Sequence, residues 1–101
     1  MDNKLKKKLR AIGHSLKPVV TVAGNGLSEG VRQELDRALD DHELIKVKLV
    51  AERDERAQLV AALAEIPSLS VVQVIGGIAL VYRPAREPNP ALSNVLRSGI
   101  L

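Results

Sequence analysis

The first hydrophobic pattern of the chain has the period of a helix. Apolar side chains recur at spacings of four, three and four residues, at Leu5, Leu9, Ile12 and Leu16. Most of the basic side chains between them fall on the opposite arc, so residues 4–16 are predicted to form a helix with a core side and a basic side. Gly13 is a weak point inside this helix. Pro18 disfavours the helical conformation of the residue before it, so we expect the helix to stop there.

A strand, a loop and a second helix are predicted next. Residues 19–22 form a short β-branched run, which is typical of a buried strand. Residues 23–26 form a loop, and Ser28 is a favourable N-cap for a helix that extends to about Asp41. The predicted buried face of this helix consists of Val31, Leu35, Ala38 and Leu39. Its outer side is acidic and carries Glu34, Asp36, Asp40 and Asp41.

A second strand and a third helix follow. Residues 44–50 alternate between apolar and polar side chains, which indicates a strand with one buried face. The apolar face carries Ile45, Val47 and Leu49, and the other face carries Lys46 and Lys48. Residues 54–65 place Ala57, Val60, Ala61, Leu63 and Ala64 in helical period, and Pro67 closes this helix.

The last regular elements are two strands joined by a tight turn. Residues 69–75 and 78–82 are apolar runs, and the two glycines between them suit a hairpin turn that needs positive φ. The predicted order is therefore α-β-α-β-α-β-β. Strands that alternate with helices favour crossover connections, and the hairpin adds an antiparallel pair. We predict an α/β fold, a compact sandwich with a mixed four-stranded sheet.

The chain divides into a domain and a tail. Residues 1–84 hold all of the predicted strands and form one domain of common size. The stretch that begins at Pro84 contains three prolines within its first seven residues, and residues 85–101 form either a flexible tail or a short amphipathic helix over Leu92, Val95 and Leu96.

Composition excludes several kinds of site. The 101 residues are 46% hydrophobic, enough for a core, but Tyr82 is the single aromatic residue. The chain has no cysteine, which excludes disulfides, zinc–thiolate sites and a cysteine nucleophile. His14 and His42 lie at helix ends without metal-ligand spacing, and we expect neither a metal nor a cofactor. No apolar run is long enough to span a membrane, so we expect a protein of the cytoplasm. We also expect it to be a monomer.

Charge is unevenly distributed along the chain. Residues 1–17 carry six basic side chains and one acidic one, whereas residues 18–82 carry six basic and ten acidic ones. Such a polar field can steer a polyanion to one face of the molecule. No pairing of histidine, serine or carboxylate side chains indicates catalysis, and we predict that the chain is not an enzyme.

The loop at residues 23–26 has two possible uses. Gly24, Gly26 and Gly30 are spaced one residue too widely for a dinucleotide fingerprint, and no Lys-Ser/Thr pair follows Gly26 as in a phosphate-binding loop of NTPases. Glycine-containing loops before a helix N-terminus also clamp the backbone of single-stranded nucleic acids, as in KH domains. Because aromatic side chains for base stacking are missing, we expect binding through phosphate contacts that depends strongly on salt.

Three stretches together resemble a known family. HSLKPVVTVAGNGLSEGV, HELIKVKLV and VVQVIGGIALVYRP, in this order and spacing, are similar to the CRM domain family (chloroplast RNA splicing and ribosome maturation), in particular its stand-alone bacterial YhbY-type members. The resemblance covers residues 4–84. It implies a CRM-type RNA-binding fold that associates with precursors of the large ribosomal subunit, without catalytic activity. The loop of the family is G-x-x-G, and Ala23 stands here at the first glycine position.

The resemblance and the charge pattern together define a candidate RNA surface. Its residues are Lys4, Lys6, Lys7, Lys8, Arg10, Lys17, Gly24, Asn25, Gly26, Lys46, Lys48 and Arg83. For Arg83 an alternative is a cap on the last strand or an ion pair with an acidic neighbour. The alternative function is a protein-interaction module that docks basic ribosomal proteins through the acidic helices.

Overall fold

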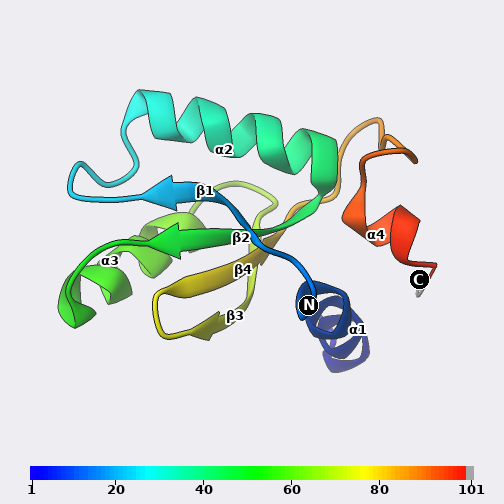
Figure 1. Cartoon of the computed structure of the whole chain (residues 1–101), viewed down its shortest axis with the longest axis horizontal. Coiled ribbons are helices and arrows are strands. Elements are labelled where there is room, and N and C mark those ends of the chain that lie inside the picture. Colours follow the sequence, from blue (N-terminus) through cyan, green and yellow to red (C-terminus); the bar gives the residue numbers. More distant parts are fainter. Residues whose placement is uncertain (100–101) are drawn as a thin grey trace.

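The computed structural model describes residues 1–99, in which four helices and four strands form an α/β fold (Figure 1). The elements are α1 (Asn3–Gly13), β1 (Pro18–Val22), α2 (Glu29–His42), β2 (Leu44–Leu49), α3 (Arg53–Ala64), β3 (Ser70–Ile75), β4 (Ile78–Tyr82) and α4 (Asn94–Ser98). The predicted order of the first seven elements is confirmed. The last two residues of the predicted tail, 100 and 101, lie outside the described part of the chain.

The sheet is mixed and four-stranded, as predicted. Its strand order is β1-β2-β4-β3, with β1 parallel to β2 and the other pairs antiparallel. The parallel pair needs a crossover, which α2 provides. Ile75 and Ile78 are register partners on either side of a two-residue turn. Gly76 has a φ of 55° in this turn, a left-handed conformation that glycine adopts without strain.

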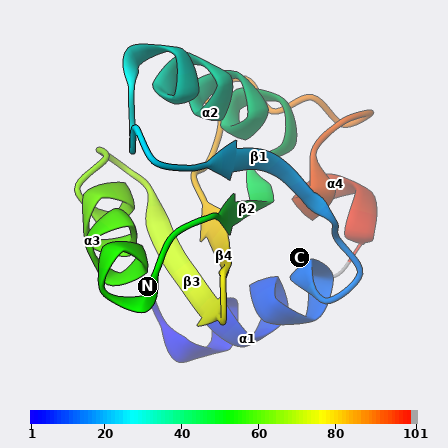
Figure 2. The same ribbon diagram turned by 60° about the vertical axis from the view of Figure 1, so that its left-hand side comes forward.

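One face of the sheet packs against α2 and α3. The core there is aliphatic: it combines Val20, Val22, Ile45, Val47, Leu49, Ala79 and Val81 of the strands with Leu35, Leu39 and Leu63 of the helices. Figure 2 shows α2 and α1 on opposite sides of the sheet. The alternation in β2 therefore sends every second side chain into this core, as the sequence predicts.

The other face of the sheet is only partly covered, by α1 and α4. A second core cluster joins Leu9 and Ile12 of α1 and Val95 of α4 to the sheet residues Leu44, Val72 and Leu80. Gly13 allows α1 to approach the sheet closely, since a Cβ atom at this position would lie 2.5 Å from Cδ2 of Leu80. The helix ends at Gly13, so the prediction that it continues to residue 16 is wrong.

Two further predictions need correction. Residues 19–22 were expected to be buried throughout, but Val19 and Thr21 are exposed because β1 is an edge strand with only one covered face. In α3 the alanines at 57, 61 and 64 face solvent. Val60 and Leu63 of the predicted set do pack against the core, together with Leu59, which was not in that set. Small side chains fit the helical period equally well on either face.

The segment after β4 is tied to the domain. Glu43 is the C-cap of α2, has a φ of 61° and is only 4% exposed. Its carboxyl oxygens accept hydrogen bonds from the Ala85 backbone N–H at 2.8 Å and from Ser93 Oγ at 2.7 Å. Ser93 is fully buried and is the N-cap of α4. Polar groups buried in this way are stabilising only when they are hydrogen-bonded, as they are here.

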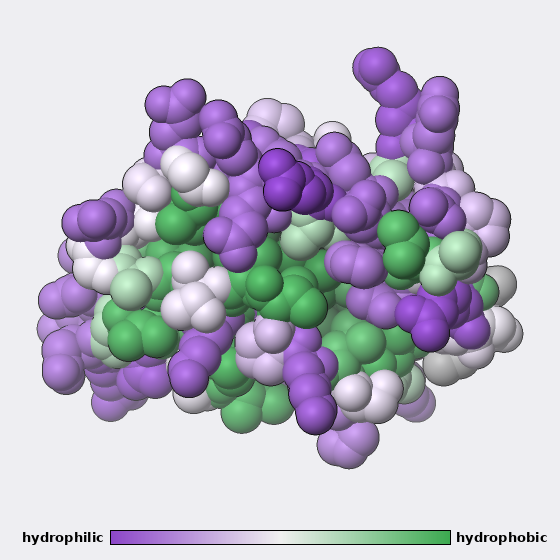
Figure 3. Space-filling view, turned by 45° about the horizontal axis from the view of Figure 1, so that its top comes forward, coloured by the Kyte–Doolittle hydropathy of each residue, from purple (hydrophilic) through white to green (hydrophobic). Residues whose placement is uncertain are grey.

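In the face that Figure 3 presents, hydrophobic residues are spread across the middle and lower part, and hydrophilic side chains project above and between them. Within residues 1–99, no helix is long and apolar enough to cross a bilayer, and no group of three or more potential metal-ligating side chains occurs.

Candidate nucleic-acid interface

Five basic residues of α1 form the first part of the candidate surface: Lys4, Lys6, Lys7, Lys8 and Arg10. Lys4, Lys7 and Arg10 are exposed, and Lys6 and Lys8 are partly buried. The ion pairs among residues 1–99 involve only Arg32 and Arg83 as cations, so all five α1 charges lack an acidic partner there. Unneutralised cations on one helix create the positive potential to which phosphates are attracted.

The sheet continues this basic surface. Lys46 and Lys48 point to the face that α1 partly covers, opposite to Ile45, Val47 and Leu49 of the main core. Lys48 is exposed and Lys46 is partly exposed, and neither takes part in an ion pair within the described residues. Lys17 is also exposed, and the residue after it, Pro18, is the register partner of Lys46. The structure therefore brings three sheet-side cations to the same side of the sheet as α1 or to its edge.

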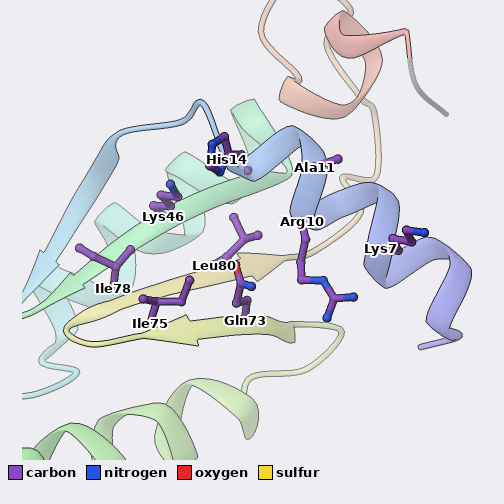
Figure 4. Close-up of a pocket in the computed structure, with 10 residues that line it drawn as sticks. Lys7, Arg10, Ala11, His14, Lys46, Gln73, Ile75, Ile78 and Leu80 are labelled. Atoms are coloured by element: carbon purple, nitrogen blue, oxygen red, sulfur yellow. The ribbon is translucent and has the colours of Figure 1, made fainter.

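A cavity of about 510 Å³ opens between α1 and the uncovered part of the sheet (Figure 4). Lys7, Arg10, Ala11, Gly13 and His14 line it from α1 and its C-cap. The sheet contributes Lys46 from β2, Gln73 and Ile75 from β3, and Ile78 and Leu80 from β4. In Figure 4 the Arg10 side chain extends from the helix down toward the level of the sheet. The cavity thus combines an apolar floor with a basic rim.

Sequence reasoning did not find the floor of this cavity. The sequence pattern places Gln73, Ile75 and Ile78 in two apolar strands but does not distinguish the faces of these strands. The two-residue periodicity of β3 and β4 already places Ile75, Ile78 and Leu80 on one face. This periodicity does not predict how much of that face α1 covers.

The glycine-containing loop forms the second part of the candidate surface. The Gly26 N–H donates to the Ala23 carbonyl at 2.8 Å, which closes a turn over Ala23–Gly26. Gly26 has a φ of 64°, whereas Ala23, Gly24 and Asn25 do not have positive φ. Ser28 then caps α2, since its Oγ accepts from the Val31 N–H at 3.3 Å. The predicted N-cap is confirmed, and only Gly26 in the turn has a backbone conformation that favours glycine.

The loop and α1 do not share one site. A separate cavity of about 450 Å³ lies between the loop and α3, lined by residues 23–26 and by Glu55, Gln58 and Leu59. It has no lining residue in common with the cavity beside α1. Figure 1 shows the loop and α1 toward opposite ends of the molecule. They are separated by the length of β1, since α1 precedes this strand and the loop follows it. A ligand that contacts both must therefore extend across the sheet.

Arg83 is engaged inside the protein. Its guanidinium donates to Asp36 Oδ1 at 2.9 Å and to Asp40 Oδ1 at 3.1 Å, and its side chain is 15% exposed. Burial disfavours the ionised form of Asp36, but hydrogen bonds and charges from Arg83 and Arg32 outweigh this and lower its pKa from the usual 3.8. This ion pair with acidic neighbours is one of the alternatives to an RNA contact that the sequence left open for Arg83.

Sequence comparison finds relatives that cover most of the chain. The sequence model of the CRS1 / YhbY (CRM) domain matches residues 1–83. A probable RNA-binding protein of Pseudomonas aeruginosa is 57% identical over 93 residues, which cover 91% of this chain and 89% of that protein. An RNA-binding protein of Haemophilus influenzae is 42% identical over 88 residues, which cover 86% of this chain and 89% of that protein.

A solved structure has the same architecture. It is the solution structure of a hypothetical protein from Staphylococcus aureus that is described as a candidate RNA-binding protein. The two structures match with a TM-score of 0.74 at 30% sequence identity, over 92% of this chain and 97% of the other. The predicted fold class and the predicted family resemblance are both confirmed.

Proposed function

The chain belongs to the CRS1 / YhbY (CRM) domain family, and from this premise we propose that it is an RNA-binding protein of ribosome assembly. In this proposal it associates with the ribosomal RNA of large-subunit precursors, as a monomer in the cytoplasm. It acts by binding, without a catalytic step. The finer part of the proposal, the ribosomal target, rests on the family resemblance and not on the geometry.

The observation that carries RNA binding is the set of unpaired cations on one side of the molecule. The five basic residues of α1 and the two lysines of β2 have no acidic partner among residues 1–99. Phosphate neutralisation by such side chains releases counterions, and this release makes binding favourable and salt-dependent. The relatives named for RNA binding support the same conclusion.

Charge neutralisation on α1 tests this proposal. We choose the three exposed positions, Lys4→Gln, Lys7→Gln and Arg10→Gln together, because exposed side chains can be changed without loss of the fold. Each lost contact to single-stranded RNA should reduce the slope of log K against log salt by about 0.7, or about 2 for the three. The measurement is fluorescence anisotropy with labelled ribosomal RNA fragments at several salt concentrations.

A matched variant controls for net charge. Arg37, Arg53 and Arg86 are exposed, lie away from α1 and take no part in an ion pair within the described residues. Their triple replacement by Gln changes the net charge equally and should leave affinity and salt slope unchanged. An equal loss of RNA affinity in both variants would mean that binding depends on net charge and not on the basic surface of α1. Co-sedimentation with large-subunit precursor particles then tests the ribosomal part separately.

The protein-interaction alternative has less structural support. Asp36 and Asp40, two of the acidic residues on the outer side of α2, already pair with Arg83. Their charge is therefore partly neutralised within the protein. We retain RNA binding as the proposed function.

A further inference from the structure

We propose that the cavity between α1 and the sheet binds one unpaired base of an RNA strand, whose neighbouring phosphates lie on Lys7, Arg10 and Lys46. This inference rests on the proposed function and extends it from the RNA backbone to the base.

The floor is aliphatic and opens to water mainly at Ile75, since Ile78 is partly buried and Leu80 is 2% exposed. Ile75 and Ile78 are register partners of the β3–β4 hairpin, and Leu80 lies two residues further along β4 on the same face. Ile75 is 67% exposed, more than any other large hydrophobic side chain within residues 1–99. An apolar area left open to water in this way is a common property of binding sites. The face of a base is apolar and flat, and it can cover such a floor.

The rim is cationic and has no counter-charge. Lys7 and Arg10 project from α1, Lys46 comes from β2, and the lining contains no aspartate or glutamate. None of these three cations forms an ion pair within residues 1–99. An occupant that fits is therefore apolar in its centre and negatively charged at its edges. A nucleotide within a strand has this distribution, with a phosphate on each side of the base.

The wall offers hydrogen bonds that an apolar chain could not use. Gln73 is partly buried at the cavity, and no hydrogen bond joins its side-chain amide to another of the described residues. An amide presents a donor and an acceptor together, which matches the edge of a base. Arg10 lines the same cavity, and a guanidinium plane can stack on a base. These groups favour a base over an acyl chain as the occupant.

The cavity also explains how this chain can hold a base without aromatic side chains. Tyr82 lies on the same face of the sheet, but it packs in the cluster beneath α1 and does not line the cavity. The base would instead lie between the aliphatic floor and Arg10. Binding would then have a salt-independent part from the floor in addition to the salt-dependent part from the rim.

The test combines a protein variant with RNA that lacks single bases. Short single-stranded RNAs are prepared with an abasic ribose at each position in turn, which removes a base but keeps every phosphate. For the unmodified protein, we expect one abasic position to weaken binding about three- to tenfold. In Ile75→Ser this penalty should disappear, the affinity for intact RNA should fall by a similar factor, and the salt slope should stay the same.

Val74→Ser is the matched control. Val74 is the neighbouring residue, is 43% exposed and is the register partner of Ala79, so it points to the opposite face of the sheet. The Val74→Ser variant should bind intact RNA with the affinity of the unmodified protein and should show the same loss of affinity for abasic RNA. Both substitutions are at exposed positions, so neither should prevent folding.

The outcomes separate this inference from the proposed function. If the unmodified protein binds RNA with a salt slope but no abasic position matters, RNA binding stands and the base site is overturned. If it binds no RNA, the proposed function itself fails. If Ile75→Ser loses association with ribosomal particles but keeps its affinity for the oligonucleotides, the cavity belongs to a protein partner and the base site is again overturned.

Discussion

Ser93 and Glu43 form a buried hydrogen bond that joins the C-terminal segment to the end of α2. The Ser93 hydroxyl donates to Glu43 Oε1 at 2.7 Å, across fifty residues of sequence. The same hydroxyl accepts from the Leu96 N–H at 3.2 Å and so caps α4. Because Val95 of α4 packs against Leu9 and Ile12, this bond also supports the position of the basic helix α1.

Replacement of Ser93 by alanine removes a single hydroxyl group but should strongly destabilise the protein. We expect a loss of about 2 kcal/mol in the free energy of unfolding, because a buried carboxyl group loses a donor and α4 loses its cap. Urea denaturation gives this value. Ser28→Ala is the control, since Ser28 is also an N-cap but is exposed and donates to no carboxyl group. It should cost about 1 kcal/mol, and equal losses would mean that the bond to Glu43 adds nothing.

Because of the Asp36–Arg83 ion pair, we expect the stability of the protein to depend on pH in the acid range. The pKa of Asp36 is lowered in the folded state, so its contribution is complete above the usual value of 3.8 and is lost as the pH falls through the lower folded-state pKa. Asp36→Asn should be less stable than the unmodified protein near neutral pH, and this difference should shrink below 3.8. Thermal unfolding at a series of pH values measures it.

An exposed carboxylate on the same helix provides the comparison for Asp36. Glu34 is exposed and takes no part in an ion pair within the described residues. Glu34→Gln should change stability little at any pH. A stability difference for Asp36→Asn that stayed constant from neutral pH into the acid range would show that the carboxylate charge is not what Arg83 requires.

Local patterns predicted most of the fold because local interactions determine it. The alternation of apolar residues and lysines in β2, the Ser28 cap and the glycine pair of the hairpin each depend on neighbouring residues only. The end of α1 does not. The helical stripe continues to Leu16, but the helix ends at Gly13, where contact with Leu80 of the sheet depends on the missing Cβ.

The candidate site was harder to predict because it depends on the arrangement of distant elements. Sequence alone suggests that the basic helix and the glycine-containing loop form one surface. They lie at opposite ends of the extended strand β1 instead, and each lines its own cavity. The role of Glu43 could not be predicted either. Nothing in its local sequence indicates that this acidic residue is 4% exposed and accepts hydrogen bonds from the C-terminal segment.

Tyr82 should titrate at higher pH than an ordinary tyrosine. Burial, and secondarily the negative charge of Glu43, raise its pKa above 10.0. Because the unfolded chain ionises at the lower value, stability should be complete below 10.0 and fall as the pH rises toward the folded-state pKa. Tyr82 is the only aromatic residue, so the near-ultraviolet absorbance of tyrosinate reports on it alone.

The same titration can separate the effect of the Glu43 charge on the pKa of Tyr82 from the effect of burial. Glu43→Gln removes the charge and should bring the pKa of Tyr82 closer to 10.0, whereas Glu87→Gln, at an exposed position, should not change it. A native titration with its midpoint at 10.0 in the unmodified protein would contradict the burial of the phenol ring.

The glycines of the loop should differ in their effect on stability and on RNA binding. Gly26 has a φ of 64°, so Gly26→Ala should cost about 1–2 kcal/mol in the free energy of unfolding. Gly24 does not have positive φ, and no heavy atom beyond its two chain neighbours lies within 4 Å of a Cβ placed there, so Gly24→Ala should be nearly neutral for stability. It therefore tests the loop as an RNA contact without disturbing the fold.

If the loop contacts the RNA backbone, Gly24→Ala should weaken RNA binding although its unfolding curve is unchanged, because the added methyl group keeps a phosphate away from the loop. Ala23→Gly restores the G-x-x-G pattern of the family. Since Ala23 does not have positive φ in this turn, we expect no gain in affinity from this change. Anisotropy titrations of the two variants beside the unmodified protein give both answers. Higher affinity in Ala23→Gly would mean that the bound loop takes up a conformation that alanine resists, different from the turn described for the free protein.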